Sequence, residues 1–224
     1  SLVGTGNDWI RMFGLPTRYA EAIRAIREGY TFLQDVAAVE YEESMYRQVR
    51  YVANVAGVGF DAAVIKRIQH SKSKGRLGAS AYLWALVRSF FSYKHTGTKV
   101  WVDGRMVYND LLLSIAIGVG RYNGGGMQQL PEAVIDDGLL DVTLIRPLHW
   151  WNIIFRLRRL FNGNIYTIGH VSHTQGKSIR IESSPEIMLE VDGELLGNTP
   201  IEIHAIHRAV RVIVNRSYLA KLTK

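Results

Sequence analysis

The stretch KVWVDGRMVYNDLLLSIAIGV, residues 99–119, decides the fold class. Two short runs rich in β-branched and aromatic residues flank the pair Asp103-Gly104, and such a pair between strand-like runs is a strong hairpin signal. The run that follows, residues 111–119, is almost wholly apolar, which predicts a buried strand. A hairpin that leads into a buried strand predicts a domain built on a β-sheet.

Similar signals recur along the chain. Residues 30–41 and 48–58 are rich in Val, Tyr and Ala and are separated by a charged turn, so they predict a second hairpin. Further strands are expected at residues 139–145, 170–181, 187–191, 201–207 and 210–214, with turns at 192–193 and 207–208. Helices are expected at residues 8–13, 17–28, 61–69, 77–93 and 150–161. The pattern predicts a mainly β fold with covering helices (α+β), arranged as a sandwich or flattened barrel.

Composition narrows the class of protein. The 224 residues are 47% hydrophobic and 21% charged, and they include no cysteine. This is the composition of a globular domain and excludes a disulfide scaffold or a thiolate zinc site. No apolar run reaches the length of a transmembrane helix. The net charge of +7 favours an anionic partner such as nucleotide phosphate or an acidic membrane surface. The basic residues are scattered without a nucleic-acid motif, so no nucleic-acid partner is expected.

The first segment that could carry chemistry is Gly4-Thr5-Gly6-Asn7-Asp8. Glycines let backbone N–H groups approach a phosphate, and the hydroxyl and amide side chains add hydrogen bonds. Asp8 could hold Mg²⁺ directly or through water. A tight turn capped by Asn7 or Asp8 explains the same residues about equally well.

Three further segments could form a site. Residues 118–126 hold three consecutive glycines after a buried strand, residues 131–141 crowd acidic residues at a turn, and residues 191–194 place Glu194 beside an Asp-Gly turn. A pliable loop can lie against a ligand, an acidic turn can bind a hard cation, and a carboxylate at a strand end can act as a general base. Each segment taken alone is better explained as a connection or turn.

Taken in order, the segments resemble the bacterial diacylglycerol kinase and sphingosine kinase-like lipid kinase family. The family motif GTxNDxxR stands complete as GTGNDWIR at residues 4–11, and NVAGVGFDA at residues 54–62 is similar to the family's strand-to-helix passage. The glycine triplet, the acidic stretch 131–141 and the DGE run 192–194 follow in the expected order. The resemblance implies the β-sandwich-like C-terminal domain of a two-domain NAD kinase/diacylglycerol kinase-like fold.

The family carries a glycine-rich GGDGT motif in a preceding nucleotide-binding domain, and that motif is absent from these 224 residues. We therefore expect a fragment that is inactive in isolation. Residues 1–28 are interpreted as the remnant of the nucleotide-binding domain and hinge, and residues 29–214 as the lipid-side domain. Residues 215–224 are interpreted as a tail that could return to the missing domain.

The resemblance also implies roles for individual residues. Glu194 corresponds to the proton acceptor that activates the lipid hydroxyl, and Asp8 and Asp35 would organise Mg²⁺ about the ATP phosphates. Gly4, Thr5 and Asn7 would contact those phosphates. A structural Mg²⁺ would be bound by the Asp137 carboxylate and the backbone carbonyls of Val134 and Leu139. The implied activity is ATP-dependent phosphoryl transfer to a lipid alcohol such as diacylglycerol or a sphingoid lipid.

Other hypotheses stay open at this stage. The chain could be a catalytically inactive lipid- or nucleotide-binding module of the same fold, or a nicotinamide nucleotide kinase. The segment WWNIIFRLRRLF, residues 150–161, combines aromatic residues with three arginines, so it could lie on an anionic membrane or simply cover the sheet. A lipid kinase implies a cytoplasmic protein that is peripheral at the membrane. Exposed sheet edges could pair in a homodimer.

Overall fold

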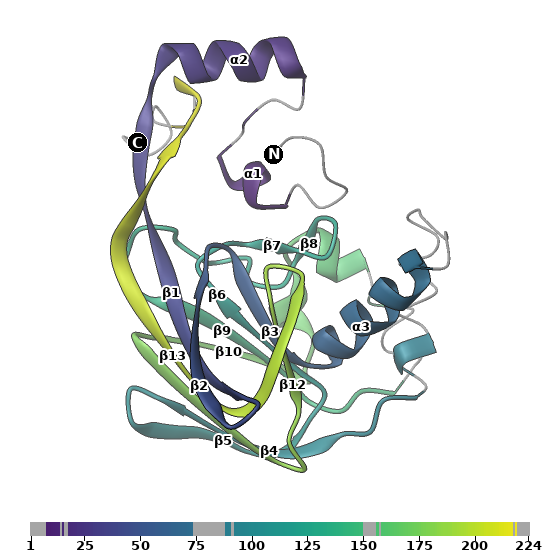
Figure 1. Ribbon diagram of the computed structural model, residues 1–224. Coiled ribbons are helices and arrows are strands. Elements are labelled where there is room, and N and C mark those ends of the chain that lie inside the picture. The colour runs from purple at the N-terminus through teal and green to yellow at the C-terminus, as the bar shows by residue number, and fades with distance from the viewer. Residues whose placement is uncertain are drawn as a thin grey trace.

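The computed structural model describes residues 8–13, 15, 18–73, 88–90, 92–149, 156, 158–216 and 218 (Figure 1). Gly4, Thr5 and Asn7 lie outside the described residues, as does most of the helices expected at 77–93 and 150–161. Within the part of the chain that is described, no helix is both long and apolar enough to cross a membrane.

Three α-helices and one short 3₁₀ helix have both ends within the described residues. They are α1 (Asp8–Met12), α2 (Tyr19–Glu28), α3 (Phe60–Ser73) and η1 (Ile165–Thr167). Helix α2 ends at Gly29, whose φ of 67° is left-handed and whose N–H bonds to the Ala25 carbonyl, the usual way for a glycine to stop a helix. Figure 1 shows α2 projecting beyond the sheet at the end where β1 begins, while α3 lies beside β3 and β12.

The strands make up about half of the described residues. They are β1 (Thr31–Glu43), β2 (Tyr46–Val52), β3 (Val55–Gly59), β4 (Thr96–Val102), β5 (Arg105–Leu112), β6 (Ser114–Gly118), β7 (Tyr122–Asn123), β8 (Met127–Gln128), β9 (Leu140–Ile145), β10 (Val171–Gly176), β11 (Ser178–Ser184), β12 (Met188–Val191) and β13 (Glu194–Ile213). Eleven form one sheet in the order β10-β9-β6-β3-β12-β13-β11-β4-β5, with β1 joined to β13 and β2 joined to β1, while β7 and β8 pair separately.

The long strand β13 turns this sheet into a curled, sandwich-like body (Figure 1). Its first residues pair with β12, and its later residues pair with β11 on one edge and β1 on the other. The strand therefore belongs to both halves of the fold. The inward side chains of these strands, among them Val39, Ile179 and Ile203, are fully buried in one core cluster.

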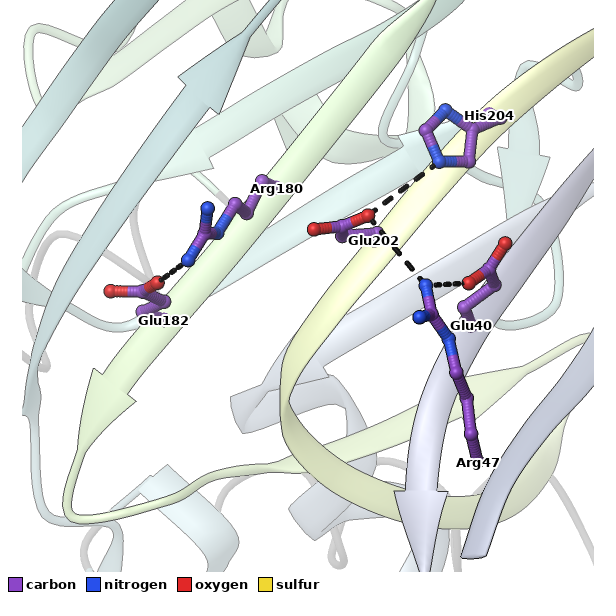
Figure 2. Close-up of polar contacts among 6 residues, drawn as sticks. All are labelled: Glu40, Arg47, Arg180, Glu182, Glu202 and His204. Carbon is purple, nitrogen blue, oxygen red and sulfur yellow. Dashed lines mark hydrogen bonds and ion pairs between the residues drawn. The ribbon is translucent and has the colours of Figure 1, made fainter. Parts of the chain in front are cut away.

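The outward face of the sheet carries ion pairs between charged side chains, some of which Figure 2 shows. Arg47 of β2 is paired with Glu40 of β1 and lies 3.9 Å from Glu202 of β13, while Arg180 and Glu182 pair along β11. Opposite charges on neighbouring strands stabilise a sheet modestly.

The hairpin predicted at Asp103-Gly104 is confirmed as the turn between β4 and β5, with both residues at positive φ. The single strand expected at residues 170–181 is wrong, because this segment forms two strands. Strand β10 pairs with β9, whereas β11, which begins after Lys177, pairs with β4 and β13. The Asp103 carboxylate holds this crossing by accepting the N–H groups of Lys177 and Ser178, each at 2.9 Å.

The turn expected at His207-Arg208 is also wrong. These residues lie inside β13, where the pairing with β1 shifts register between Gln34 and Val36. Arg208 has a φ of 48°, and its N–H donates to the Asp35 carboxylate at 2.5 Å. The polar residues that indicated a turn therefore form a β-bulge that is held by a buried carboxylate on the neighbouring strand.

Candidate functional site

The DGE run forms the tight turn between β12 and β13. Asp192 and Gly193 have φ of 49° and 90°, which suits a two-residue hairpin turn. The Asp192 carboxylate accepts the backbone N–H groups of Ala53, Asn54 and Val55 at 2.9, 3.1 and 3.1 Å. Burial raises the pKa of Asp192, although these hydrogen bonds oppose the rise. Asp192 thus fixes the turn to the start of β3.

Glu194 is the first residue of β13 and lies opposite Val191 in the hairpin. Its side chain is 64% exposed and forms an ion pair with Arg50 of β2. The carboxylate is therefore accessible to a substrate while one cation holds its orientation. Arg50 was not predicted from the sequence, because its position in β2 is distant along the chain from the DGE run.

Helix α1 lies against the glycine loop. The Gly125 N–H donates to Asp8 Oδ2 at 2.7 Å, and Arg11 Nε lies 3.7 Å from Asp8 Oδ1. A Cβ placed on Gly126, whose φ is +104°, would lie 2.2 Å from Arg11 Nη1. The glycine is required at that position because any side chain would displace the guanidinium and strain the backbone. Asp8 is therefore a buried contact between the first motif and the glycine triplet.

Two buried amide side chains connect these segments. Trp9 Nε1 donates to Gln34 Oε1 at 3.0 Å, and Gln34 Nε2 donates to the Ala53 carbonyl at 2.5 Å. The Asn54 side chain donates to the Tyr122 carbonyl at 2.8 Å. Because Ala53 and Asn54 also bind Asp192, α1, the glycine loop and the DGE turn belong to one hydrogen-bonded network.

Asp35 has a separate set of partners. Its carboxylate is fully buried and accepts the N–H groups of Gly138 and Arg208, and His207 Nδ1 lies 2.9 Å away. Asp35 therefore joins the acidic stretch 131–141 to the bulge in β13. The structure gives Asp8 and Asp35 separate partners, so their joint action on a phosphate-bound metal stays a prediction.

The acidic stretch provides oxygen donors of the kind that Mg²⁺ prefers. The Asp137 side chain accepts the Leu139 N–H at 3.0 Å, and Asp136 lies 3.5 Å from Arg208. The described residues include no cluster of three or more His, Cys, Asp or Glu side chains that could hold a metal. A cation here would therefore depend on Asp137 and on the backbone carbonyls of Val134 and Leu139, a donor set that fits a hard ion.

An apolar cavity of about 80 Å³ opens beside the network. Its walls come from α3, β6, the glycine loop, β9 and the segment around η1, and they include Val64, Leu113, Met127, Leu148, Ile165 and Ile168. The polar side chains Asp61, Ser114, Asn123, Gln129 and Glu190 line part of it. Such a cavity suits an apolar ligand with a polar end. Glu190 was not predicted as a site residue. The sequence does mark it, because it is a charged residue within the otherwise apolar run Met188–Val191.

The arginine-rich segment 150–161 is described only in part. Arg156 lines the cavity, and Arg159 donates to the carbonyl and hydroxyl oxygens of Thr167 at 3.1 and 3.0 Å. Two of the three arginines therefore contact other parts of the protein. Contact of this segment with a membrane stays a prediction.

Comparison with known proteins gives the fold a family. A family model described as the YegS C-terminal NAD kinase beta sandwich-like domain matches residues 54–214. A diacylglycerol kinase of Mycobacterium tuberculosis (strain H37Rv) is 29% identical over 212 residues, which cover 94% of this chain and 66% of that protein. The chain thus spans somewhat less than two thirds of this relative.

Solved structures show the same architecture. A diacylglycerol kinase from Bacillus anthracis matches with a TM-score of 0.65 and 22% identity over 96% of this chain and 65% of that one. Yeast NADH kinase complexed with NADH matches with a TM-score of 0.51 and 12% identity over 95% of this chain and 54% of that one. At these identities the likeness concerns the fold alone. The predicted β-sandwich-like, NAD kinase/diacylglycerol kinase-like class is confirmed.

Proposed function

The chain belongs to the family of the YegS C-terminal NAD kinase beta sandwich-like domain, and on this premise we propose that it forms the lipid-side part of an ATP-dependent lipid kinase. The activity would transfer the γ-phosphate of ATP to a lipid hydroxyl, as in diacylglycerol kinases. The observation that carries the proposal is the shared network, in which Asp192 ties the Glu194 turn to the residues that also hold α1 and the glycine loop.

Glu194 would accept the proton of the lipid hydroxyl as its oxygen attacks the γ-phosphate. An unassisted hydroxyl is a weak nucleophile, and a carboxylate within hydrogen-bond reach lowers the barrier. The exposed position of Glu194 and its pairing with Arg50 suit this role, because the carboxylate is accessible and the ion pair orients it. The first motif, including Gly4, Thr5 and Asn7, would bind the nucleotide phosphates, with Asp8 holding the glycine loop beside them.

Magnesium, when bound, would neutralise charge on the transferring phosphoryl group. Asp137 is the carboxylate we assign to a structural cation in the acidic stretch, and Asp35 orders that stretch through Gly138. The acyl chains of the lipid would enter the apolar cavity, since its lining side chains are mostly aliphatic.

A kinase assay on the full-length protein tests the proposal. Radiolabelled ATP and 1,2-dioctanoyl-glycerol in mixed micelles should give a labelled phosphatidic acid that is separated by thin-layer chromatography. A panel of other lipid alcohols, including a sphingoid base, identifies the preferred acceptor. Binding of lipid without phosphorylation of any member of the panel would favour an inactive binding module and contradict the proposal.

Filling the cavity should selectively impair long-chain lipids. Val64 is 3% exposed and lines the cavity, so Val64→Trp would occupy the space of several methylenes. Excluding about two methylenes costs about 1.6 kcal/mol, or roughly a 10-fold rise in KM. We expect this rise for dioleoylglycerol and a smaller one for dioctanoylglycerol.

The matched control for this variant is Val107→Trp, at an exposed position of β5, which should leave both KM values unchanged. Thermal unfolding of both variants separates blocked binding from lost folding. Equal increases in KM for the long and short lipids in a folded Val64→Trp protein would place the acyl chains elsewhere.

Magnesium should stabilise the protein through Asp137. At about 100 times its Kd an ion adds about 2.7 kcal/mol to the free energy of unfolding, which corresponds to a rise in Tm of roughly 5–10 °C for a chain of this size. Asp137→Asn should abolish this rise, whereas Asp110→Asn, on an exposed part of β5, should retain it. An undiminished magnesium effect in Asp137→Asn would remove the assigned ligand.

A further inference from the structure

Two carboxyl groups, Asp61 on α3 and Glu190 on β12, lie together where the apolar cavity becomes polar. We propose that this pair binds the polar headgroup of the acceptor lipid, with Glu190 donating a hydrogen bond to it and Asp61 accepting one. The inference rests on the proposed lipid kinase function and adds to it the chemistry of the headgroup, which is neutral and carries hydroxyl groups. The pair is separate from Glu194, which acts on the reacting hydroxyl in that proposal.

Gly57 of β3 allows the two side chains to meet. A Cβ on this glycine would lie 2.8 Å from Glu190 Oε1 and 2.9 Å from Asp61 Cβ. The Asp61 and Glu190 side chains therefore both pack against Gly57, and a larger residue at position 57 would displace them. The surrounding hydrogen bonds fix their orientation, since Gln129 Nε2 donates to both oxygens of Asp61 at 3.3 and 3.2 Å.

Glu190 also contacts the DGE turn directly. The Gly193 N–H donates to Glu190 Oε2 at 2.9 Å, and Gly193 immediately precedes Glu194. Glu190, at the polar end of the cavity, is thus hydrogen-bonded to the turn that carries the proposed base, Glu194. A headgroup held by Glu190 would lie beside the residues that position that base.

The protonation of the pair provides one donor and one acceptor. Burial raises the pKa of Glu190 to about 8, and the negative charge of Asp61 adds to the rise. Burial likewise raises the pKa of Asp61 to about 6, while hydrogen bonds from Ser114 and Gln129 oppose it. Near pH 7 Glu190 is therefore mostly a carboxylic acid and Asp61 mostly a carboxylate, and a hydroxyl can bond to both.

The groups around the pair favour a neutral headgroup. Asp192 raises the pKa of Glu190 further, Asn123 and Arg156 line the same cavity, and Lys66 of α3 points to the Met188 sulfur, 3.9 Å away. Among the described residues, none of the causes of the two pKa shifts is a cation. Binding a hydroxyl leaves the single proton of the pair in place, whereas binding a cation would require the pair to lose it.

The test is the pH dependence of lipid binding by the full-length protein without ATP. The probe is 1-octanoyl-glycerol, which keeps one hydroxyl for the pair beside the reacting one. Its Kd, measured by tryptophan fluorescence from pH 6 to 9.5, should rise about 10-fold as Glu190 loses its proton above pH 8, because one hydrogen bond to the headgroup is lost. Glu190→Gln keeps a donor at every pH, so it should bind as tightly as wild type at pH 7 and show no rise. Glu190→Leu should bind about 10-fold more weakly at all pH values.

Glu186→Gln, an exposed change near the same strand, is the matched control and should retain the wild-type profile. The inference is overturned if Glu190→Gln keeps the rise above pH 8, if Glu190→Leu binds as wild type does, or if sphingosine binds more tightly than 1-octanoyl-glycerol at pH 7. The kinase assay is scored separately. Phosphorylation with a pH-independent lipid Kd would reject only the headgroup assignment, and pH-dependent binding without phosphorylation would reject only the kinase.

Discussion

Replacing Glu194 with Gln is expected to lower kcat for phosphoryl transfer to a lipid hydroxyl by about 1000-fold, within the range that general bases contribute. Gln fills the same volume and can still hydrogen-bond, but it cannot accept a proton. The KM for the lipid should change little, because the side chain is exposed at the start of β13 and the acyl chains bind in the cavity. The measurement is the initial rate with dioctanoylglycerol at saturating ATP.

Glu186→Gln serves as the control for this variant, since it makes the same chemical change on the surface and should retain wild-type kcat. Loss of the Glu194–Arg50 ion pair should cost little stability, because exposed pairs contribute about 0–1 kcal/mol. A thermal unfolding curve close to that of wild type would therefore accompany the loss of activity. A Glu194→Gln protein as active as wild type would show that another group accepts the proton.

The sequence predicted the parts of the fold that depend on local patterns. Asp103-Gly104 specifies its hairpin because few residues adopt the required positive φ, and the Val-, Tyr- and Ala-rich composition of residues 30–41 matches strand β1. The path of β13 was not predictable in this way. His207 and Arg208 have the composition of a turn, and only the buried Asp35 on a distant segment makes them a bulge.

The candidate site likewise combines residues that local motifs indicate with residues that only the fold brings together. Local motifs, through the family resemblance that they carry, singled out Asp8 and Glu194, whose catalytic roles stay predictions. They could not locate Arg50, which meets Glu194 across 144 residues of sequence. Nor could they assign a partner to Glu190, because the buried environment that raises its pKa is built by α3, the glycine loop and the DGE turn together.

Asp35 is the position at which substitution should cost the most stability. Its carboxylate is fully buried and receives two backbone N–H groups and the His207 ring. Asp35→Ala would leave the Gly138 and Arg208 N–H groups without an acceptor, and each unsatisfied buried group costs about 1–3 kcal/mol. We expect the free energy of unfolding to fall by about 3–5 kcal/mol, which lowers Tm by roughly 10 °C for a chain of this size.

Two further variants separate this structural role from the role in Mg²⁺ binding that the family resemblance implies. Asp110→Ala on the exposed face of β5 should leave Tm within about 1 °C of wild type, since surface substitutions usually change stability by less than 0.5 kcal/mol. Asp35→Asn keeps one carbonyl acceptor, so it should unfold between wild type and Asp35→Ala. If Asp35→Asn loses most of its kinase activity while its Tm stays near that of wild type, Asp35 acts mainly on the metal. If activity falls only in proportion to the unfolded fraction, the carboxylate acts by holding the acidic stretch against the bulge in β13.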